Sequence, residues 1–375
     1  MKVMIVVTHL LGTGHLSRAL TLGRAFVAAG HEVTVVSGGR PAPQLDARGM
    51  DVVQLPALAS KGTAFTTLLD DTGAEADAAY LQSRTEKLLE TFAALAPDVL
   101  ITELYPFGRR VLRTEFLALL DAARARSPHP LIYASIRDIL APPSKPDRAG
   151  QTEEIVTTVY DGVLVHSDAT ATKLDASWPV TPALEAKLHY TGYVAPPPAS
   201  PNPDGAGQDE VLVSAGGGDV GDALYAAALT AAGADTARWR MLVGGGAERL
   251  AAWQARAGDA AIVEAPRPDF RQMLHGAAAL VSMCGYNTTL DVLQSGVPAV
   301  FVPFDDGGEV EQTLRAETLA RLPGIRVLPA ADLTPERLAQ ALRDVLSDGP
   351  RSALDLRFDG AAETVRLITR ARAMA

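Results

Sequence analysis

The sequence predicts an α/β protein built from two Rossmann-like domains that face a cleft. Three observations predict this fold: short apolar runs alternate with helical patterns, a stretch rich in proline and glycine interrupts the alternation, and the alternation restarts after it. With 375 residues, the chain has the length of two ordinary domains. Such alternation predicts parallel strands joined by crossover helices.

The first domain is predicted to span residues 1–195. Its apolar runs predict strands at 3–7, 32–37, 51–55, 98–102, 131–135 and 162–166, and its amphipathic patterns predict helices at 17–29, 81–95 and 115–125. Glycines soon interrupt the opening apolar run, and no small-residue cleavage site follows it. We therefore expect a first buried strand and not a signal peptide.

The stretch VAPPPASPNPDGAGQ marks the boundary, and residues 196–208 are predicted to be a linker. The second domain, 209–352, is predicted to have strands at 210–214, 240–243, 261–264, 278–283, 299–302 and 324–328, with helices at 221–232, 249–256, 288–294, 313–322 and 334–346. Residues 353–375 are expected to form a C-terminal helix that packs back on the first domain.

Composition excludes several classes of function. Hydrophobic residues make up 47% and charged residues 21%, which is typical of a soluble globular protein, and the net charge of −10 argues against a nucleic-acid partner. The single cysteine, Cys284, excludes an intramolecular disulfide, and no histidine pair has zinc-ligand spacing. No apolar stretch reaches the roughly eighteen residues of a transmembrane segment. We expect a cytoplasmic protein without a metal.

The first glycine loop, after the opening strand, contains Gly12, Gly14 and His15. Glycines allow a ligand to approach the backbone closely, so we expect Gly12 and Gly14 to contact the acceptor. A helix N-terminus favours the neutral form of a nearby histidine. Neutral imidazole is a suitable general base for a hydroxyl nucleophile, although a structural hydrogen bond would explain His15 as well. The loop lacks the third glycine of a dinucleotide-binding fingerprint, which disfavours a redox enzyme.

Two further glycine runs follow strands of the second domain. Gly216, Gly217 and Gly218 precede a helix, so their amides could bind a diphosphate. The run lacks the Lys-Ser/Thr pair of a P-loop, so it does not support ATP hydrolysis. Gly244 opens the other run, which could equally be a tight turn.

Residues 281–316 contain the densest group of candidate ligand contacts. Asp291 lies in the predicted helix and could reach a ribose diol, while Glu311 and Gln312 begin the following helix. The strand before Asp291 turns into its helix through Gly285, Tyr286, Asn287 and Thr288. A capped strand-helix unit with solvated acids is the alternative.

The strand DVLIT of the first domain ends at Glu103, which could orient His15 or hold an acceptor. Arg109, with its neighbours Arg110 and Arg113, adds positive charge to an acidic protein. These arginines could bind an acidic acceptor, although solvated arginines at a helix start are the alternative.

With these loops identified, the chain resembles the two-domain GT-B glycosyltransferases, most closely the MurG-like group that includes the N-acetylglucosaminyltransferase of peptidoglycan synthesis. The string ITELYPFGRR also resembles a group of uncharacterised predicted glycosyltransferases. The resemblance covers nearly the whole chain and is most specific in the C-terminal half.

The resemblance implies a role for each loop. It implies that Gly216 to Gly218 bind the diphosphate, that the backbone at Arg267 and Pro268 reads the base, and that Asp291 binds the ribose. It also implies that Glu311 and Gln312 bind the sugar and that His15 is catalytic. The family usually has Glu at the Asp291 position and often His at the Glu311 position. The first domain lacks a lysine-flanked apolar patch, which does not favour peptidoglycan synthesis.

The predicted function is that of an inverting, metal-independent glycosyltransferase. It would move a sugar from a nucleotide diphosphate sugar, UDP-linked by default, to a hydroxyl or amine of a small-molecule or glycan acceptor. The nucleotide sugar would be a co-substrate, and no cofactor is expected. A nucleotide-sugar epimerase or hydrolase on the same fold, and a non-catalytic nucleotide-sugar-binding protein, are the alternatives. The sequence does not identify the acceptor or the oligomeric state.

Overall fold

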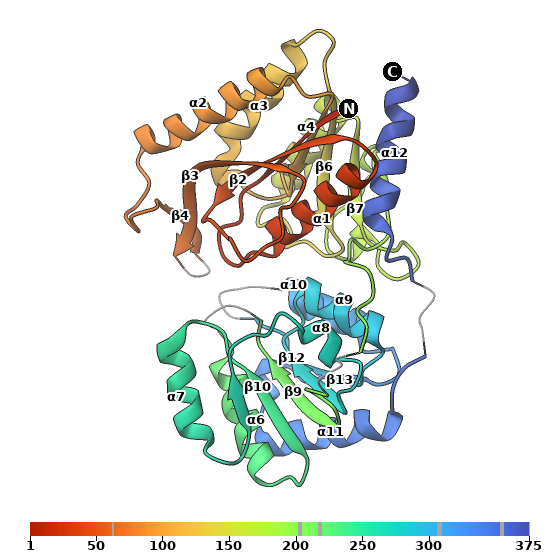
Figure 1. Cartoon of the computed structure of the whole chain (residues 1–375). Helices are drawn as coiled ribbons and strands as arrows, with labels where there is room; N and C mark the ends of the chain where they lie inside the picture. The colour runs from red at the N-terminus through yellow and green to blue at the C-terminus, as the bar shows by residue number, and fades with distance from the viewer. Residues whose placement is uncertain (62–63, 202–204, 217–219, 306–309, 353–355, 375) are drawn as a thin grey trace. The chain divides into compact units, whose positions relative to one another are not determined.

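A computed structural model describes residues 1–61, 64–201, 205–216, 220–305, 310–352 and 356–374 (Figure 1). The chain divides into two compact units. The first combines Met1–Pro196 with Leu356–Ala375, and the second is Pro197–Asp355. Residues of the predicted linker from Pro197 onward therefore belong to the second unit, and the end of the chain belongs to the first.

The first unit contains a mostly parallel sheet of strand order β4-β3-β2-β1-β5-β6-β7-β8. Only the pairing of β3 with β4 is antiparallel among the described strand pairs. The strands are β1 (Lys2–Val7), β2 (Glu32–Gly39), β3 (Asp51–Lys61), β4 (Ala64–Leu69), β5 (Val99–Glu103), β6 (Leu131–Arg137), β7 (Gly162–His166) and β8 (Leu188–Tyr190).

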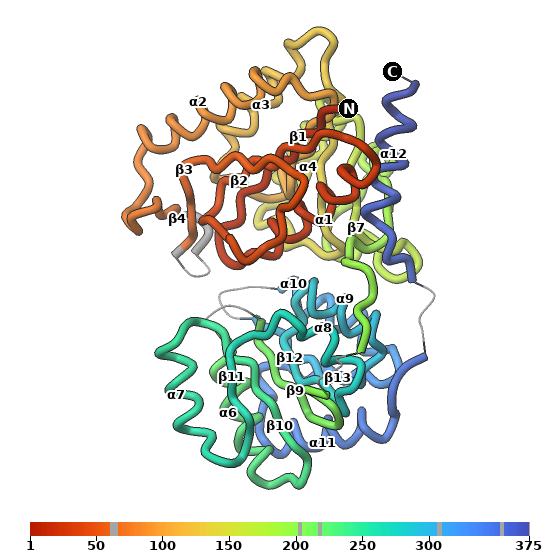
Figure 2. Tube along the Cα trace, in the orientation of Figure 1, coloured from red at the N-terminus to blue at the C-terminus, as the bar shows by residue number. Residues whose placement is uncertain are grey.

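Helices cover both faces of this sheet, because side chains alternate between the faces along each strand. Val3 and Ile5 pack against α1 (Gly14–Ala28) and α12 (Gly360–Met374), which lie side by side (Figures 1 and 2). Met4 points to the opposite face, where α2 (Ala78–Leu95) packs against α3 (Arg113–Ala125). Also in this unit are α4 (Pro146–Val159), α5 (Pro182–Glu185) and the 3-10 turns Arg110–Leu112 and Leu174–Ala176.

The second unit contains a parallel sheet of strand order β11-β10-β9-β12-β13-β14. Its strands are β9 (Glu210–Ser214), β10 (Arg238–Leu242), β11 (Ile262–Glu264), β12 (Ala279–Ser282), β13 (Ala299–Phe301) and β14 (Ile325–Val327). Its helices are α6 (Asp222–Gly233), α7 (Ala247–Ala257), α8 (Phe270–Met273), α9 (Tyr286–Ser295), α10 (Glu311–Leu319), α11 (Pro335–Asp348) and the 3-10 turn Ala330–Asp332. Side chains of α6, α7 and α11 share one core with the strands.

Each sheet contains a point where the chain reverses the direction in which it adds strands. In the first unit this point lies between β1 and β5, and in the second between β9 and β12. In open parallel sheets a ligand-binding crevice forms outside the carboxyl ends of the two strands at such a point. The loops after β1, β5, β9 and β12 are therefore the places to look for a site.

The two parallel-sheet units confirm the predicted α/β fold, but several elements differ from the prediction. The strand predicted at 51–55 is longer, because β3 continues to Lys61 and pairs with β4. The strand β8 and the helix α4 were not predicted. Of the helices just described, none has the length and apolar character needed to cross a membrane. The cytoplasmic location stays a prediction.

Two glycines of the first unit test how its C-terminal segment packs. A Cβ added to Gly360 would lie 2.2 Å from the Gly192 carbonyl oxygen, whereas one added to Gly150 in α4 would meet no atom within 4 Å. We expect Gly360→Ala to lower the free energy of unfolding by about 1–3 kcal/mol through overpacking. Gly150→Ala should raise it by about 0.5–1 kcal/mol. Urea denaturation measures both, and equal effects would contradict this packing.

Candidate functional site

His15 and Glu103 meet where the first sheet reverses its strand order. His15 is the second residue of α1, which follows β1, and Glu103 is the last residue of β5. Because β1 and β5 are parallel neighbours, with Val6 opposite Thr102, their carboxyl ends meet at one edge. His15 Nδ1 lies 2.9 Å from Glu103 Oε1, and the two side chains are 14% and 1% exposed.

Glu103 is buried but ionised. Burial would raise the pKa of its carboxyl, but the Arg18 guanidinium and hydrogen bonds from His15 and Ser135 outweigh burial and hold this pKa below its usual range. Arg18 lies one turn after His15 on α1 and donates to Glu103 Oε1. Ser135, at the end of β6, donates to Glu103 Oε2 across 2.6 Å.

His15 is therefore a neutral imidazole with a defined tautomer. Burial lowers the pKa of His15 to about 3, even though Glu103 favours its charged form. An ionised carboxylate only accepts hydrogen bonds, so the contact with Glu103 assigns a proton to Nδ1. Arg18 Nη2 lies 3.1 Å from the same nitrogen, and with this tautomer it donates to Glu103 and not to His15. The lone pair is then on Nε2. We predicted a neutral His15 from its place at a helix N-terminus, but burial is the main physical cause.

The candidate acceptor residues border the same edge of the first sheet. Arg109 adopts a left-handed backbone conformation with φ 58°, and its Nε donates to the Thr8 carbonyl across 2.6 Å. Such strain in a residue other than glycine often occurs at functional sites. Burial lowers the pKa of Arg109 to about 10, so it keeps its charge at neutral pH. Gly14 begins α1, and a Cβ on Gly12 would meet no atom within 4 Å.

In the second unit, the start of α6 lies next to the strand reversal. Gly216 has φ 86°, and a Cβ there would meet no atom within 4 Å. Gly217 and Gly218 lie outside the described residues. Helix α6 begins after Gly221, which supplies no side-chain cap. Gly244 is buried, and its carbonyl accepts from Arg249 across 2.8 Å, so the second glycine run forms the turn into α7.

Helix α9 begins at the other strand of the reversal. Its N-cap, Gly285, makes no side-chain capping bond, and a Cβ there would meet no atom within 4 Å. Tyr286 is buried beneath the Arg315 guanidinium, whereas Asn287 is exposed and Thr288 half-buried. Helix N-termini with open backbone amides bind anions. This helix start is therefore suited to a phosphate group.

Asp291 is held by an arginine that the sequence did not single out. Its Oδ1 accepts from Arg271 Nε across 2.7 Å. Arg271 also donates to Gln294 Oε1 at 2.8 Å and to the Pro197 carbonyl at 2.9 Å. Burial raises the pKa of Asp291 to about 6, although Arg271 acts in the opposite direction. An ionised carboxylate can accept hydrogen bonds at both oxygens, so Asp291 is best suited to bind a diol above that pH.

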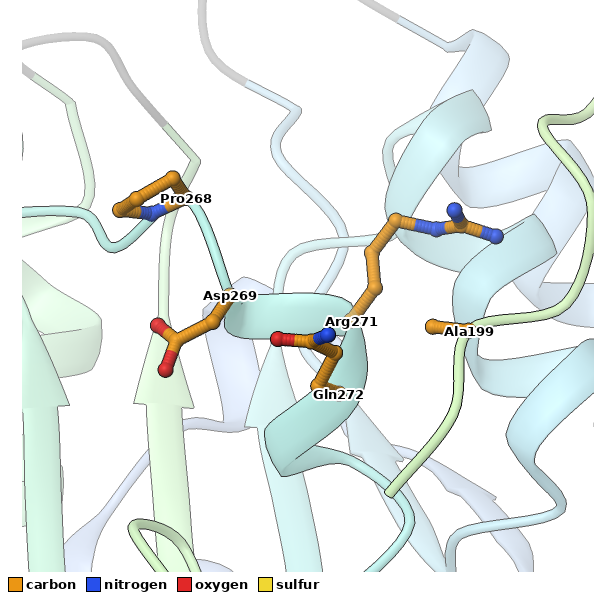
Figure 3. Close-up of a pocket in the computed structure, with 5 residues that line it drawn as sticks. All are labelled: Ala199, Pro268, Asp269, Arg271 and Gln272. Atoms are coloured by element: carbon orange, nitrogen blue, oxygen red, sulfur yellow. The ribbon is translucent and has the colours of Figure 1, made fainter. Parts of the chain in front are cut away.

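A cavity of about 330 Å³ lies beside Arg271 (Figure 3). Its lining residues are Ala199, Pro268, Asp269, Arg271 and Gln272. Pro268 thus lines a cavity of ligand size, and its role in reading the base stays a prediction. Arg267 does not line it; its guanidinium forms a two-pronged pair with Asp269 at 2.8 and 2.7 Å.

The two residues predicted to bind the sugar begin α10. Glu311 is buried in the first turn of the helix, and Gln312 Oε1 accepts from the Phe304 backbone N–H at 3.2 Å. Arg315 on the same helix donates to the Cys284 carbonyl at 3.1 Å, which fixes α10 against the start of α9. Gln312 therefore stabilises the loop after β13, a role that the sequence did not suggest.

The structure thus gathers His15, Glu103 and Arg109 in the first unit and Asp291 and Pro268 in the second. Sequence reasoning missed Arg18, Ser135, His166 and Arg271. Arg18 could have been found, because it lies three residues after His15 on a predicted helix. In the described ranges, no three His, Cys, Asp or Glu side chains are grouped to hold a metal ion.

Glu103→Gln tests the buried pair with Arg18. Removing one partner of such a pair costs about 3–5 kcal/mol, so the free energy of unfolding should fall by that amount in urea denaturation. Asp46→Asn, in the exposed pair with Arg48, should cause no measurable loss. Because the pKa of Glu103 is lowered on folding, its contribution is complete above the usual pKa of about 4.3 and is lost as the pH falls further. A wild-type stability for Glu103→Gln would show that the pair is not stabilising.

Comparison with known proteins agrees with this arrangement. Residues 256–360 match the glycosyltransferase family 28 C-terminal domain. The chain is similar to the UDP-N-acetylglucosamine--N-acetylmuramyl-(pentapeptide) pyrophosphoryl-undecaprenol N-acetylglucosamine transferase of Mycobacterium bovis. The two sequences are 26% identical over 355 residues, and the match covers 91% of this chain and 80% of that protein.

Two solved structures show the same fold. MurG of Acinetobacter baumannii superposes with a TM-score of 0.62 at 16% identity, over 98% of this chain and 99% of that chain. The glycosyltransferase VinC in complex with dTDP superposes with a TM-score of 0.60 at 16% identity, over 100% of both chains. The chain is therefore a glycosyltransferase of the GT-B fold, with a match to the family 28 C-terminal domain over residues 256–360 and similarity to the MurG group along most of its length.

Proposed function

We propose that the chain is an inverting, metal-independent glycosyltransferase that moves a sugar from a nucleotide diphosphate sugar to an acceptor hydroxyl or amine. The observation that carries this proposal is the His15–Glu103 pair, with a neutral imidazole whose Nδ1 lies 2.9 Å from an ionised carboxylate. This pair supplies a general base whose unprotonated nitrogen is Nε2. The proposal assigns the base to the first unit and the donor to the second.

In the proposed reaction, His15 Nε2 takes the proton from the acceptor hydroxyl or amine. The freed electron pair forms a bond to the anomeric carbon of the sugar as the bond from that carbon to the diphosphate oxygen breaks. Glu103 stabilises the imidazolium that forms. Displacement from the side opposite the diphosphate inverts the anomeric configuration.

The departing diphosphate gains negative charge, which the helix starts of the second unit are suited to stabilise. Both α6 and α9 begin after a glycine, which has no side chain to accept from the first backbone amides of the helix. Amides at a helix N-terminus are suited to an anion. In the proposal these amides, with those of Gly217 and Gly218, perform the task that a metal ion performs elsewhere.

The donor side of the proposal rests on Asp291 and on the cavity lined by Pro268. Asp291 would accept hydrogen bonds from the ribose diol, and Glu311 and Gln312 would contact the sugar. The M. bovis relative is named for UDP-N-acetylglucosamine and VinC was solved with dTDP. We therefore propose UDP as the first donor nucleotide to test, in a thermal-shift panel of UDP-, dTDP-, GDP- and ADP-sugars.

His15→Ala should abolish transfer while nucleotide binding stays intact. A general base raises the reaction rate by roughly 10²- to 10⁴-fold. The transfer rate of His15→Ala should therefore fall at least about 100-fold with the best sugar donor of the panel. Calorimetry with the nucleotide should give the wild-type affinity. His129→Ala, at an exposed position of the first unit, is the matched control. Retained turnover in His15→Ala would sink the base assignment, and sugar release without an acceptor would indicate a hydrolase.

Asp291→Ala should weaken binding of the nucleotide sugar about 10- to 100-fold, because a hydrogen bond to a charged group contributes about 1.5–3 kcal/mol. Binding to the wild type should weaken as the pH falls below about 6, where Asp291 takes up a proton. Gln294→Ala removes another contact of Arg271 and should leave the affinity within about twofold. Calorimetry measures the affinity of both variants and of the wild type at each pH. Unchanged affinity in Asp291→Ala would contradict the ribose contact.

A further inference from the structure

From Glu103, a row of buried polar side chains continues across the first sheet, and the proposed reaction does not use the members beyond Glu103. One side chain comes from each successive position: Glu103 at the end of β5, Ser135 in β6, His166 at the end of β7, and Thr191 just after β8. All four residues are at most 2% exposed. Buried polar groups need partners, and these side chains find them in one another.

The hydrogen bonds of the row are continuous. Ser135 Oγ lies 2.6 Å from Glu103 Oε2 and 3.0 Å from His166 Nε2, and His166 Nδ1 lies 2.9 Å from Thr191 Oγ1. The row therefore joins the carboxylate beside His15 to the far edge of the sheet without a gap. Its geometry is set by strand register, because Glu103 is paired with Ser135, and Arg137 with His166.

The direction of each hydrogen bond follows from what the groups can donate. Ionised Glu103 only accepts, so the single hydroxyl proton of Ser135 must point to Glu103. Ser135 Oγ can then only accept from His166, which requires a proton on His166 Nε2. Burial lowers the pKa of His166 to about 3, so this ring is neutral and its Nδ1 is an acceptor. The Thr191 hydroxyl lies 2.9 Å from this nitrogen and 2.9 Å from the Gly192 carbonyl oxygen, so both acceptors are within its reach. The donors of His166 and Ser135 therefore both point toward Glu103.

We propose that Ser135 and His166 are positioning residues for catalysis, which hold the Glu103 carboxylate in the one orientation that aims His15 Nε2 at the acceptor. This inference rests on the proposed function of His15. Glu103 Oε1 accepts hydrogen bonds from His15 and Arg18, and Oε2 accepts one from Ser135, so both oxygens are held in place. Hydrogen bonds in such a chain polarise one another, which strengthens the bond that reaches the carboxylate.

The surrounding charges show why this support matters. The guanidinium groups of Arg18, Arg109 and Arg137 all disfavour a positive charge on His15, and Glu103 opposes them. Proton transfer to His15 therefore depends on the placement of one carboxylate. A small rotation of Glu103 would weaken its bond to His15 Nδ1 and lower the basicity of Nε2.

The far end of the row is anchored by the backbone. Thr191 precedes Gly192 and Tyr193, and the Tyr193 N–H donates to the Arg357 carbonyl at 2.7 Å. The Gly360 N–H in turn donates to the Tyr193 carbonyl at 3.0 Å. The C-terminal segment of the first unit thus holds the strand end from which Thr191 extends.

Nitrogen-15 NMR of the intact, histidine-labelled protein tests the direction of the row without any substrate. The His166 signals, assigned by their loss in His166→Gln, should show a proton on Nε2, none on Nδ1, and no titration between about pH 5 and 8. Ser135→Ala removes the acceptor, so the His166 tautomers should become mixed. A proton on Nδ1, or unchanged His166 signals in Ser135→Ala, would falsify the donor chain.

Steady-state kinetics then test the positioning role, with the best donor of the panel and its acceptor. Ser135→Ala and His166→Leu should each lower kcat about tenfold, a fraction of the contribution of a general base, with the donor KM within about twofold. His166→Gln keeps a donor near the Nε2 position and should recover most of the rate. Thr102→Val removes a buried hydroxyl from the opposite face of β5 and should leave kcat within about twofold.

The outcomes separate this inference from the proposed function. If wild-type protein transfers sugar and both Ser135→Ala and His166→Leu keep the wild-type kcat, the row is only structural and the inference is overturned. If the wild type shows no transfer, the proposed function fails, while the NMR result still decides the direction of the row. Equal losses of kcat in His166→Gln and His166→Leu would also overturn the positioning role, because the hydrogen bond donated to Ser135 would then not affect the rate.

Discussion

The reversal of strand order in each sheet is the constraint on which both candidate sites depend. Because β1 and β5 are neighbours although about ninety residues of chain separate them, a histidine after one and a glutamate at the end of the other share a hydrogen bond. In the second sheet β9 and β12 are neighbours in the same way, so the strand ends that lead into α6 and α9 lie side by side. Ser282 Oγ donates to the Ser214 carbonyl at 2.7 Å and joins the two strand ends there.

Each site contains a carboxylate held by an arginine, but the two pairs differ in their electrostatics. Glu103 receives hydrogen bonds from three side chains, and its pKa stays below the usual range despite burial. Asp291 is contacted by Arg271, and burial raises its pKa to about 6. Glu103 is thus held as an anion beside the base, whereas the charge of Asp291 changes more easily near neutral pH. In the proposed function the first carboxylate has a catalytic role and the second a binding role.

Strand-end logic found His15 and Glu103 from sequence, because each follows a clear apolar run and carboxyl ends of parallel strands meet. The same logic did not find Ser135 and His166. Both fall inside the apolar strings LIYASIR and GVLVH, where a polar residue resembles the end of a strand. Arg271 was missed because its partners Asp291 and Pro197 are distant in sequence. The short strand β8 and the antiparallel strand β4 were missed because their stability comes from pairing with neighbours and not from local pattern.

The central claim is that His15 is a neutral base whose proton is held on Nδ1 by Glu103. Nitrogen-15 NMR of the His15 ring, assigned through the His15→Ala variant, measures this most directly. The account predicts a protonated Nδ1 and an unprotonated Nε2 throughout about pH 5 to 8. A proton on Nε2, or titration near the ordinary histidine pKa of about 6.5, would contradict it.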